Sequence, residues 1–162
     1  MMIDKEEAKK RAQNGALLLG ISGEREFEDW SSVIAGEPVL VHDLMGEPSY
    51  WVVPLLKDNT LVGFARIGKD GEIEAIGSLS GATTVTGIDA EEALELLKSQ
   101  VELEEGEELS PPLYVHDGPP GKEAWLFVTR KHGRPWRWIF VTPAFVYERR
   151  AGQVPRGEEN IE

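Results

Sequence analysis

The stretch "VHDLMGEPSYW" at residues 41–51 is matched by "VHDGPPGKEAW" at residues 115–125. Both contain a Val-His-Asp triplet and end on a tryptophan, at an offset of 74 residues (115 − 41). The overlay continues without a gap to residues 64 and 138, and it places the turn "KDN" on the turn "KHG". Because internal similarity at a fixed offset is typical of repeated structural units, we interpret the match as a duplication.

A helix is predicted before each of these stretches. "DKEEA" at residues 4–8 is matched by "DAEEA" at residues 89–93, where an aspartate can cap a helix and a glutamate stands three residues later. The helix offset is 85 residues (89 − 4), so the first repeat holds 11 more residues (85 − 74) than the second. We assign these residues to an inserted segment at 22–36.

Each predicted helix is followed by short runs of β-branched and aromatic residues that turn-forming residues separate, which is typical of an antiparallel meander. We therefore predict an α+β protein of two tandem α-β-β-β units, each with an antiparallel sheet covered by a helix. The first repeat is residues 1–82, the second is 83–150, and 151–162 form a tail that we expect to be mobile. In "PWRWIFV", alternation separates Trp136, Trp138 and Phe140 from Arg137, Ile139 and Val141. We expect the tryptophan face to lie beneath the helix.

A helix that opens D-x-E-E-A, followed by a small meander with a K-D-G type turn, resembles the PepSY family of small modules. The matching stretches are "DAEEALELL", "SYWVVPLLKDNTLVGFARIGKDGEI" and "EAWLFVTRKHGRPWRWIFV". The resemblance implies two tandem PepSY-like domains. It also implies a non-enzymatic protein with an inhibitory or peptide-binding role.

Composition excludes several classes of function. The chain has 17 basic and 29 acidic residues and a net charge of −12, which disfavours nucleic-acid binding through phosphate contacts. It has no cysteine, which excludes disulfides, thiolate nucleophiles and cysteine-ligated metals. No apolar run is long enough for membrane insertion, and residues 1–15 lack the apolar core of a signal peptide. We expect a cytoplasmic protein without a cofactor, and the oligomeric state stays open.

The repeated pairs His42 with Asp43 and His116 with Asp117 are candidate site residues. If the two repeats bring these pairs together, His42 and His116 could bind a divalent metal ion with the two carboxylates. Neighbouring residues of a strand point to opposite faces, however, so one pair cannot readily face one ion. The alternative, which we favour, is that both aspartates accept backbone N–H groups in turns.

The cluster "RKHGRPWRW" at residues 130–138 is basic and aromatic within an acidic chain. Arg130, Arg134 and Trp136 are therefore candidates for binding a carboxylate-rich peptide or a phosphate. The alternative, which we favour, is a hairpin turn whose charges are balanced by acidic neighbours and whose two tryptophans lie in the core.

No serine lies in a G-x-S-x-G motif, and no pair of carboxylates is singled out for acid–base catalysis. We therefore predict a non-catalytic protein or peptide interaction module with an inhibitory or regulatory role, whose partner adds to an open sheet face or a free strand edge. The alternative is a metal-ion or small-ligand site at the junction of the two repeats.

Overall fold

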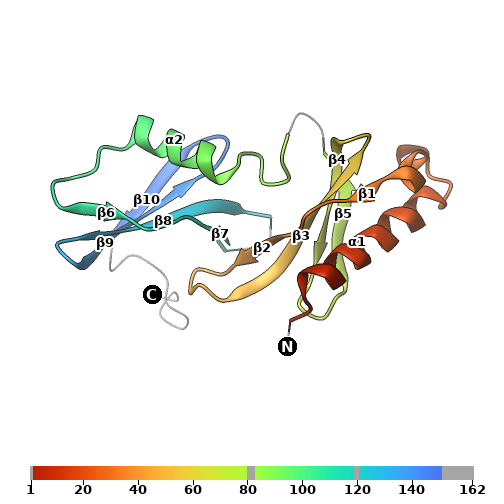
Figure 1. Ribbon diagram of the computed structural model, residues 1–162, viewed down its shortest axis with the longest axis horizontal. Coiled ribbons are helices and arrows are strands. Elements are labelled where there is room, and N and C mark those ends of the chain that lie inside the picture. The colour runs from red at the N-terminus through yellow and green to blue at the C-terminus, as the bar shows by residue number, and fades with distance from the viewer. Residues whose placement is uncertain (1, 80–82, 119–120, 151–162) are drawn as a thin grey trace. The chain divides into compact units, whose positions relative to one another are not determined.

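The computed structural model of the protein describes residues 2–79, 83–118 and 121–150 (Figure 1). The chain forms two compact units, each described separately below. The first unit comprises Met1–Val41 and Pro48–Val85, and the second comprises His42–Glu47 and Thr86–Glu162. The protein is α+β with a mostly antiparallel sheet, as the sequence predicts. The predicted mobile tail lies outside the described residues.

The first unit contains one long helix and an antiparallel meander of β3, β4 and β5 (Figure 1). Its elements are α1 (Lys5–Gly20), η1 (Arg25–Phe27), η2 (Trp30–Ser32), β1 (Ile34–Ala35), β2 (Val39–His42, whose last residue belongs to the second unit), β3 (Pro48–Lys57), β4 (Thr60–Ile67) and β5 (Ile73–Ser78). The short strand β1 pairs with β3. Asp4 begins α1 as predicted, because its carboxylate accepts the Glu7 N–H at 2.8 Å.

Small residues let α1 lie close to the sheet. Ala8, Ala12 and Ala16 are fully buried in one core cluster with Val53 and Leu55. The start of the helix is also tied to β3, because the Trp51 indole N–H donates to the Ile3 carbonyl at 3.1 Å. The position of α1 on the sheet therefore depends on close packing and on one specific hydrogen bond.

The segment 22–36, predicted as an insertion, contributes to this core. It contains η1, η2 and β1, and it buries Phe27 and Trp30 with their ring centroids 4.8 Å apart in an edge-to-face contact. A Cβ added at Gly63 of β4 would lie 2.7 Å from Trp30 Cη2 and would collide with the Gly77 carbonyl oxygen. The missing side chain of Gly63 thus makes the space that Trp30 fills.

We expect Gly63→Ala to lower the free energy of unfolding by about 2 kcal/mol or more, because the added methyl group overpacks the site against backbone. Urea unfolding followed by circular dichroism measures the change. Gly77→Ala is the matched control, since its added Cβ would meet only Phe64 Cε1, at 3.8 Å, and we expect a change within about 0.5 kcal/mol. Equal effects of the two substitutions would contradict the packing argument.

The second unit also combines one helix with an antiparallel meander, here of β7, β8, β9 and β10 (Figure 1). Its elements are α2 (Ala90–Gln100), β6 (Glu107–Leu109), β7 (Leu113–His116), β8 (Glu123–Lys131), β9 (Arg134–Val141) and β10 (Val146–Arg150). The short strand β6 pairs with β8. Asp89 and Glu92 form the predicted capping box at the start of α2.

The core beneath α2 is made of larger apolar residues. Ala93 and Leu97 of the helix cluster with Phe127, Ile139 and Val141 of the sheet. The Trp125 indole N–H donates to the Ile88 carbonyl at 2.9 Å, directly before the cap residue Asp89. Trp51 makes the same kind of bond directly before the cap residue of α1.

The pairing of β8 with β9 follows that of β3 with β4 at a constant offset of 74 residues. Trp51 pairs with Ile67, and Trp125 pairs with Val141. The β-bulges occur at equivalent steps, between Leu55 and Leu56 in one hairpin and between Thr129 and Arg130 in the other. The pairing of β1 with β3 and that of β6 with β8 obey the same offset.

The predicted three strands per unit are too few. β1 lies in the predicted insertion, and β6 lies in the acidic run "ELEEGEEL", outside the predicted strands. The sequence does not predict β6, because Glu-Glu-Leu is poor in strand-forming residues. Its buried Glu107 is paired with Arg137, which lies far away in the sequence.

The predicted orientation of β9 is also wrong. α2 covers the face that carries Ile139 and Val141, whereas Trp138 and Phe140 belong to the cluster with Leu126 on the other face. Because both faces of β9 carry apolar residues, their alternation along the sequence does not show which face α2 covers. It also breaks at the bulge, where Thr129 pairs with Arg137 and Arg130 with Pro135, which leaves Trp136 as the extra residue.

Candidate functional site

Asp43 has the turn-forming role that the favoured interpretation gives it. Its Oδ1 atom accepts the N–H groups of Met45 at 2.9 Å and Glu47 at 3.0 Å. The Asp43 N–H donates to the Glu47 carbonyl at 2.8 Å. The carboxylate therefore organises the loop between β2 and β3.

Asp117 has a different role, because side chains bind its carboxylate. The aspartate is 5% exposed; Tyr147 donates its hydroxyl to Oδ2 at 2.5 Å, and Arg149 binds both oxygens at 2.8 and 2.9 Å. Burial alone would raise the pKa of Asp117, but the hydrogen bonds from Arg149 and Tyr147 outweigh it and lower the pKa. Asp117 thus fastens β10 to the end of β7.

The two predicted metal ligands, His42 and His116, contact backbone carbonyls. The Nδ1 atom of His42 lies 3.3 Å from the Tyr114 carbonyl oxygen, and that of His116 lies 2.7 Å from the Gly118 carbonyl oxygen. Within residues 2–79, 83–118 and 121–150, no three His, Asp or Glu side chains are grouped so that they could hold a metal ion. The metal-site alternative gains no support from this geometry.

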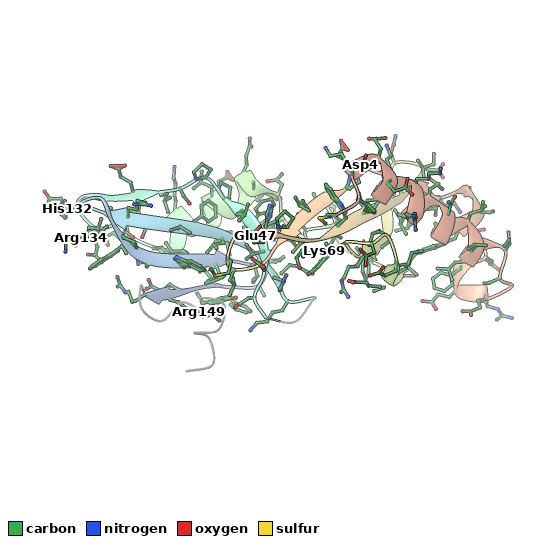
Figure 2. The ribbon with its side chains drawn as sticks, turned by 90° about the horizontal axis from the view of Figure 1, so that it is seen from below. Asp4, Glu47, Lys69, His132, Arg134 and Arg149 are labelled. Carbon is green, nitrogen blue, oxygen red and sulfur yellow. The ribbon has the colours of Figure 1, made fainter. Side chains whose placement is uncertain are left out.

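The three candidate residues of the basic hairpin, Arg130, Arg134 and Trp136, have different surroundings in the structure. Arg134 is exposed at the tip between β8 and β9 beside His132 (Figure 2), and Arg130, also exposed, donates to the Gly133 carbonyl at 3.4 Å. Trp136 is half-buried, with the Lys131 ammonium 4.6 Å from its ring centroid. Trp136 is therefore part of an internal contact, while the two arginines point to solvent.

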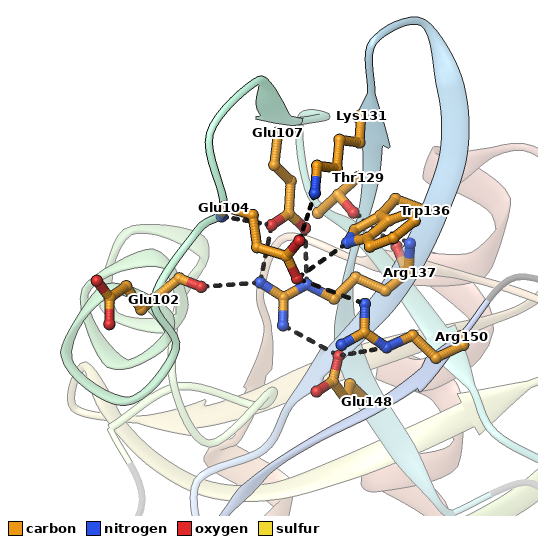
Figure 3. A network of polar contacts seen from close by, with 9 residues as sticks. All are labelled: Glu102, Glu104, Glu107, Thr129, Lys131, Trp136, Arg137, Glu148 and Arg150. Carbon is orange, nitrogen blue, oxygen red and sulfur yellow. Dashed lines mark hydrogen bonds and ion pairs between the residues drawn. The ribbon is translucent and has the colours of Figure 1, made fainter.

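Trp136 borders a buried polar network centred on Arg137 (Figure 3). The guanidinium of Arg137 binds Glu107 at 2.6 and 2.9 Å, Glu148 at 3.1 Å and the Glu102 carbonyl at 3.0 Å. The Glu107 side chain is 0% exposed and that of Arg137 is 6% exposed. This network joins β6, β9 and β10 to the segment that follows α2.

Glu104 forms an outer layer of the same network. Its carboxylate binds Lys131 at 2.6 Å and accepts the Trp136 indole N–H at 3.4 Å, and Arg150 lies 3.8 Å away (Figure 3). The hydrogen bond from Lys131 is the main cause of a lowered pKa at Glu104. These polar groups satisfy one another inside the unit, so the network is structural.

The first unit exposes large apolar side chains at the C-terminal end of α1. Leu17 is 45% exposed, Leu18 is 64% exposed and Ile21 is 68% exposed. Ile21 directly follows the helix and its N–H donates to the Leu17 carbonyl at 3.2 Å, so all three residues lie at the same end of α1. Contiguous apolar surface on a soluble protein marks interaction sites, which makes this surface, Leu17, Leu18 and Ile21, the candidate functional site.

Sequence reasoning missed this surface because it treated α1 only as a core-covering helix. The available signal was the run "ALLLGI" at residues 16–21, which places more apolar residues together than one buried helix face can hold. Among the helices of the described residues, none is both long enough and apolar enough to cross a membrane. The chain matches no family model, no curated protein and no solved structure.

Proposed function

We propose that the protein is a non-catalytic protein or peptide interaction module and that its first unit contacts the partner. The observation that carries the proposal is the apolar surface of Leu17, Leu18 and Ile21. Burying such side chains against a partner stabilises a complex through the hydrophobic effect. The prominent polar clusters of the second unit, around Arg137 and Asp117, are engaged in internal contacts.

We also propose that the two units are tandem copies of one PepSY-like fold. The support is the constant 74-residue offset of the strand pairing, together with the equivalent indole bonds of Trp51 and Trp125. On this proposal the two copies have diverged. In the first copy, Trp30 packs against Gly63. In the second copy, the equivalent position (63 + 74) is Arg137, which forms an ion pair with Glu107. An inhibitory or regulatory role agrees with a module that binds without catalysis.

The test is selection of a random twelve-residue peptide library, displayed on phage, against the immobilised full-length chain. We expect a related group of peptides to be enriched. We also expect Leu18→Glu combined with Ile21→Glu to weaken their binding at least about tenfold, because two charges replace exposed apolar side chains. Fluorescence anisotropy with labelled peptides measures the affinities.

Met45→Glu is the matched control. Met45 is 57% exposed but lies in the second unit, so the same charge there is expected to leave peptide binding unchanged. Selection that enriches nothing beyond a bare support would contradict the interaction function. Peptides that bind the Leu18 and Ile21 variant as tightly as the unmodified chain would contradict the assigned surface.

A further inference from the structure

The outer edge of β5 presents backbone groups that no strand of the described residues pairs with. Directly after β5, the Leu79 N–H donates to the Val62 carbonyl at 2.9 Å, and within β5 Gly77 pairs with Phe64 in the same register. Backbone direction alternates along a strand, so the N–H and C=O groups of Ile76 and Ser78 point away from β4. In the described part of the chain, β5 pairs only with β4.

β5 has little of the usual protection of an edge strand, because its one irregularity in pairing lies near its start, between the pairs Arg66–Ala75 and Ile67–Ile73. Glu74 is the only charged residue within Ile73–Ser78. The edge strand of the second unit, β10, differs, because Glu148 binds Arg137 and Arg149 binds Asp117. Charged side chains and ion pairs at an edge discourage the addition of another strand. The edge of the first unit is therefore the one suited to accept a partner.

Apolar side chains lie beside this edge. α1 approaches β5 so closely that a Cβ added at Gly15 would lie 2.6 Å from Ile73 Cδ1 and 3.3 Å from Ile76 Cδ1. Leu18 lies one turn further on the same side of α1, is 64% exposed, and belongs to the apolar surface described above. Ile73 is 41% exposed. A strand added to β5 would place alternate side chains on the α1 side, near Leu18 and Ile73.

The charges around β5 indicate the kind of strand that fits. Glu72 and Glu74 are exposed, and each places a carboxylate oxygen 2.7 Å from the Cβ position of Gly68, so the two carboxylates converge. Neither is in an ion pair with another described residue. A lysine or arginine of an added strand that lies at this end of the edge would be attracted by the two carboxylates.

We propose that β5 binds an extended peptide segment of alternating apolar and basic residues by antiparallel strand addition. This proposal rests on the interaction function proposed above and names the partner class. Backbone groups of Ile76 and Ser78 supply the hydrogen bonds, Leu18 and Ile73 contact the apolar residues, and Glu72 with Glu74 attract the basic ones.

The test uses three synthetic peptides with the full-length chain: one that alternates Lys and Val, one that alternates Glu and Val, and a Lys-Val peptide N-methylated at every second amide. Isothermal titration calorimetry measures their affinities. We expect the first to bind, and the other two to bind at least about tenfold more weakly, since one has the wrong charge and the other lacks backbone donors. Equal binding of the methylated and unmethylated peptides would overturn strand addition.

Ser78→Pro is the corresponding change in the protein, because proline removes the N–H that points away from β4. We expect it to weaken binding of the Lys-Val peptide about tenfold, and we expect the matched control Ser78→Ala, which keeps this N–H, to have no effect. Circular dichroism checks the fold of both variants, and the methylated peptide tests the proposal should the proline variant not fold. Library peptides that need Leu18 but tolerate Ser78→Pro would support the interaction function and overturn strand addition.

Discussion

Replacing Arg137 with methionine is expected to lower the free energy of unfolding by about 3–5 kcal/mol, because it leaves the Glu107 carboxylate buried without its partner. Glu107 would keep the Glu104 N–H, at 2.9 Å, but it would lose the guanidinium bonds at 2.6 and 2.9 Å. Urea unfolding at pH 7, followed by circular dichroism, measures the loss.

The double variant Glu107→Val with Arg137→Met is the informative control. Replacing a whole buried ion pair by apolar residues is often neutral, so we expect the double variant to regain most of the stability and to end within about 1 kcal/mol of the unmodified chain. The first unit supports this expectation, because under the proposed duplication the equivalent of Glu107 is Val33 (107 − 74), which is 1% exposed in an apolar core. A double variant as unstable as Arg137→Met would contradict this explanation.

Arg134→Met is a second control for the general effect of replacing an arginine in β9. Arg134 is exposed at the hairpin tip, so its replacement is expected to change the free energy of unfolding by less than about 0.5 kcal/mol. A loss comparable with that of Arg137→Met would show that burial does not distinguish the two arginines.

Both helices could be predicted from sequence because their signals are local. Asp4 and Asp89 accept N–H groups only three residues away, so each cap is visible in a five-residue motif. The meander was predictable for the same reason, since the turn at Asp58 and Asn59 stands between two runs of strand-forming residues. Local chemistry therefore accounts for the α+β class.

The missed features depend on contacts between residues far apart in the sequence. Nothing near Glu107 indicates that Arg137, 30 residues later, will bury it and make β6 part of the sheet. Asp117 is a similar case, because Tyr147 and Arg149 lie 30 and 32 residues away. Asp43 has the same local sequence, Val-His-Asp, yet caps its own turn. Identical triplets thus acquire different roles through their distant partners.

Acid is expected to destabilise the protein through Glu107. Burial alone would raise the pKa of this carboxyl group, but the hydrogen bonds from Arg137, from the Glu104 N–H and from Thr129 outweigh burial and lower the pKa from 4.5 to about 2. Because the pKa is lower in the folded state, the unfolded chain binds more protons in acid. The stabilisation is therefore complete above about pH 4.5 to 5 and is lost as the pH falls towards 2.

The expected loss from this group is about 3 kcal/mol, since each unit of pKa difference corresponds to about 1.4 kcal/mol. The lowered pKa of Asp117 adds to it in the same direction. Urea unfolding at pH 7, 5, 4 and 3 measures the dependence, and the Glu107→Val with Arg137→Met variant isolates the contribution of Glu107, because it lacks this carboxyl group but keeps Asp117. We expect its stability to fall less between pH 5 and 3 than that of the unmodified chain. If stability falls equally with pH in the two proteins, Glu107 has the same pKa in the folded and unfolded states. That result would contradict the prediction, because a carboxylate bound to Arg137 at 2.6 Å should have a lower pKa in the folded state.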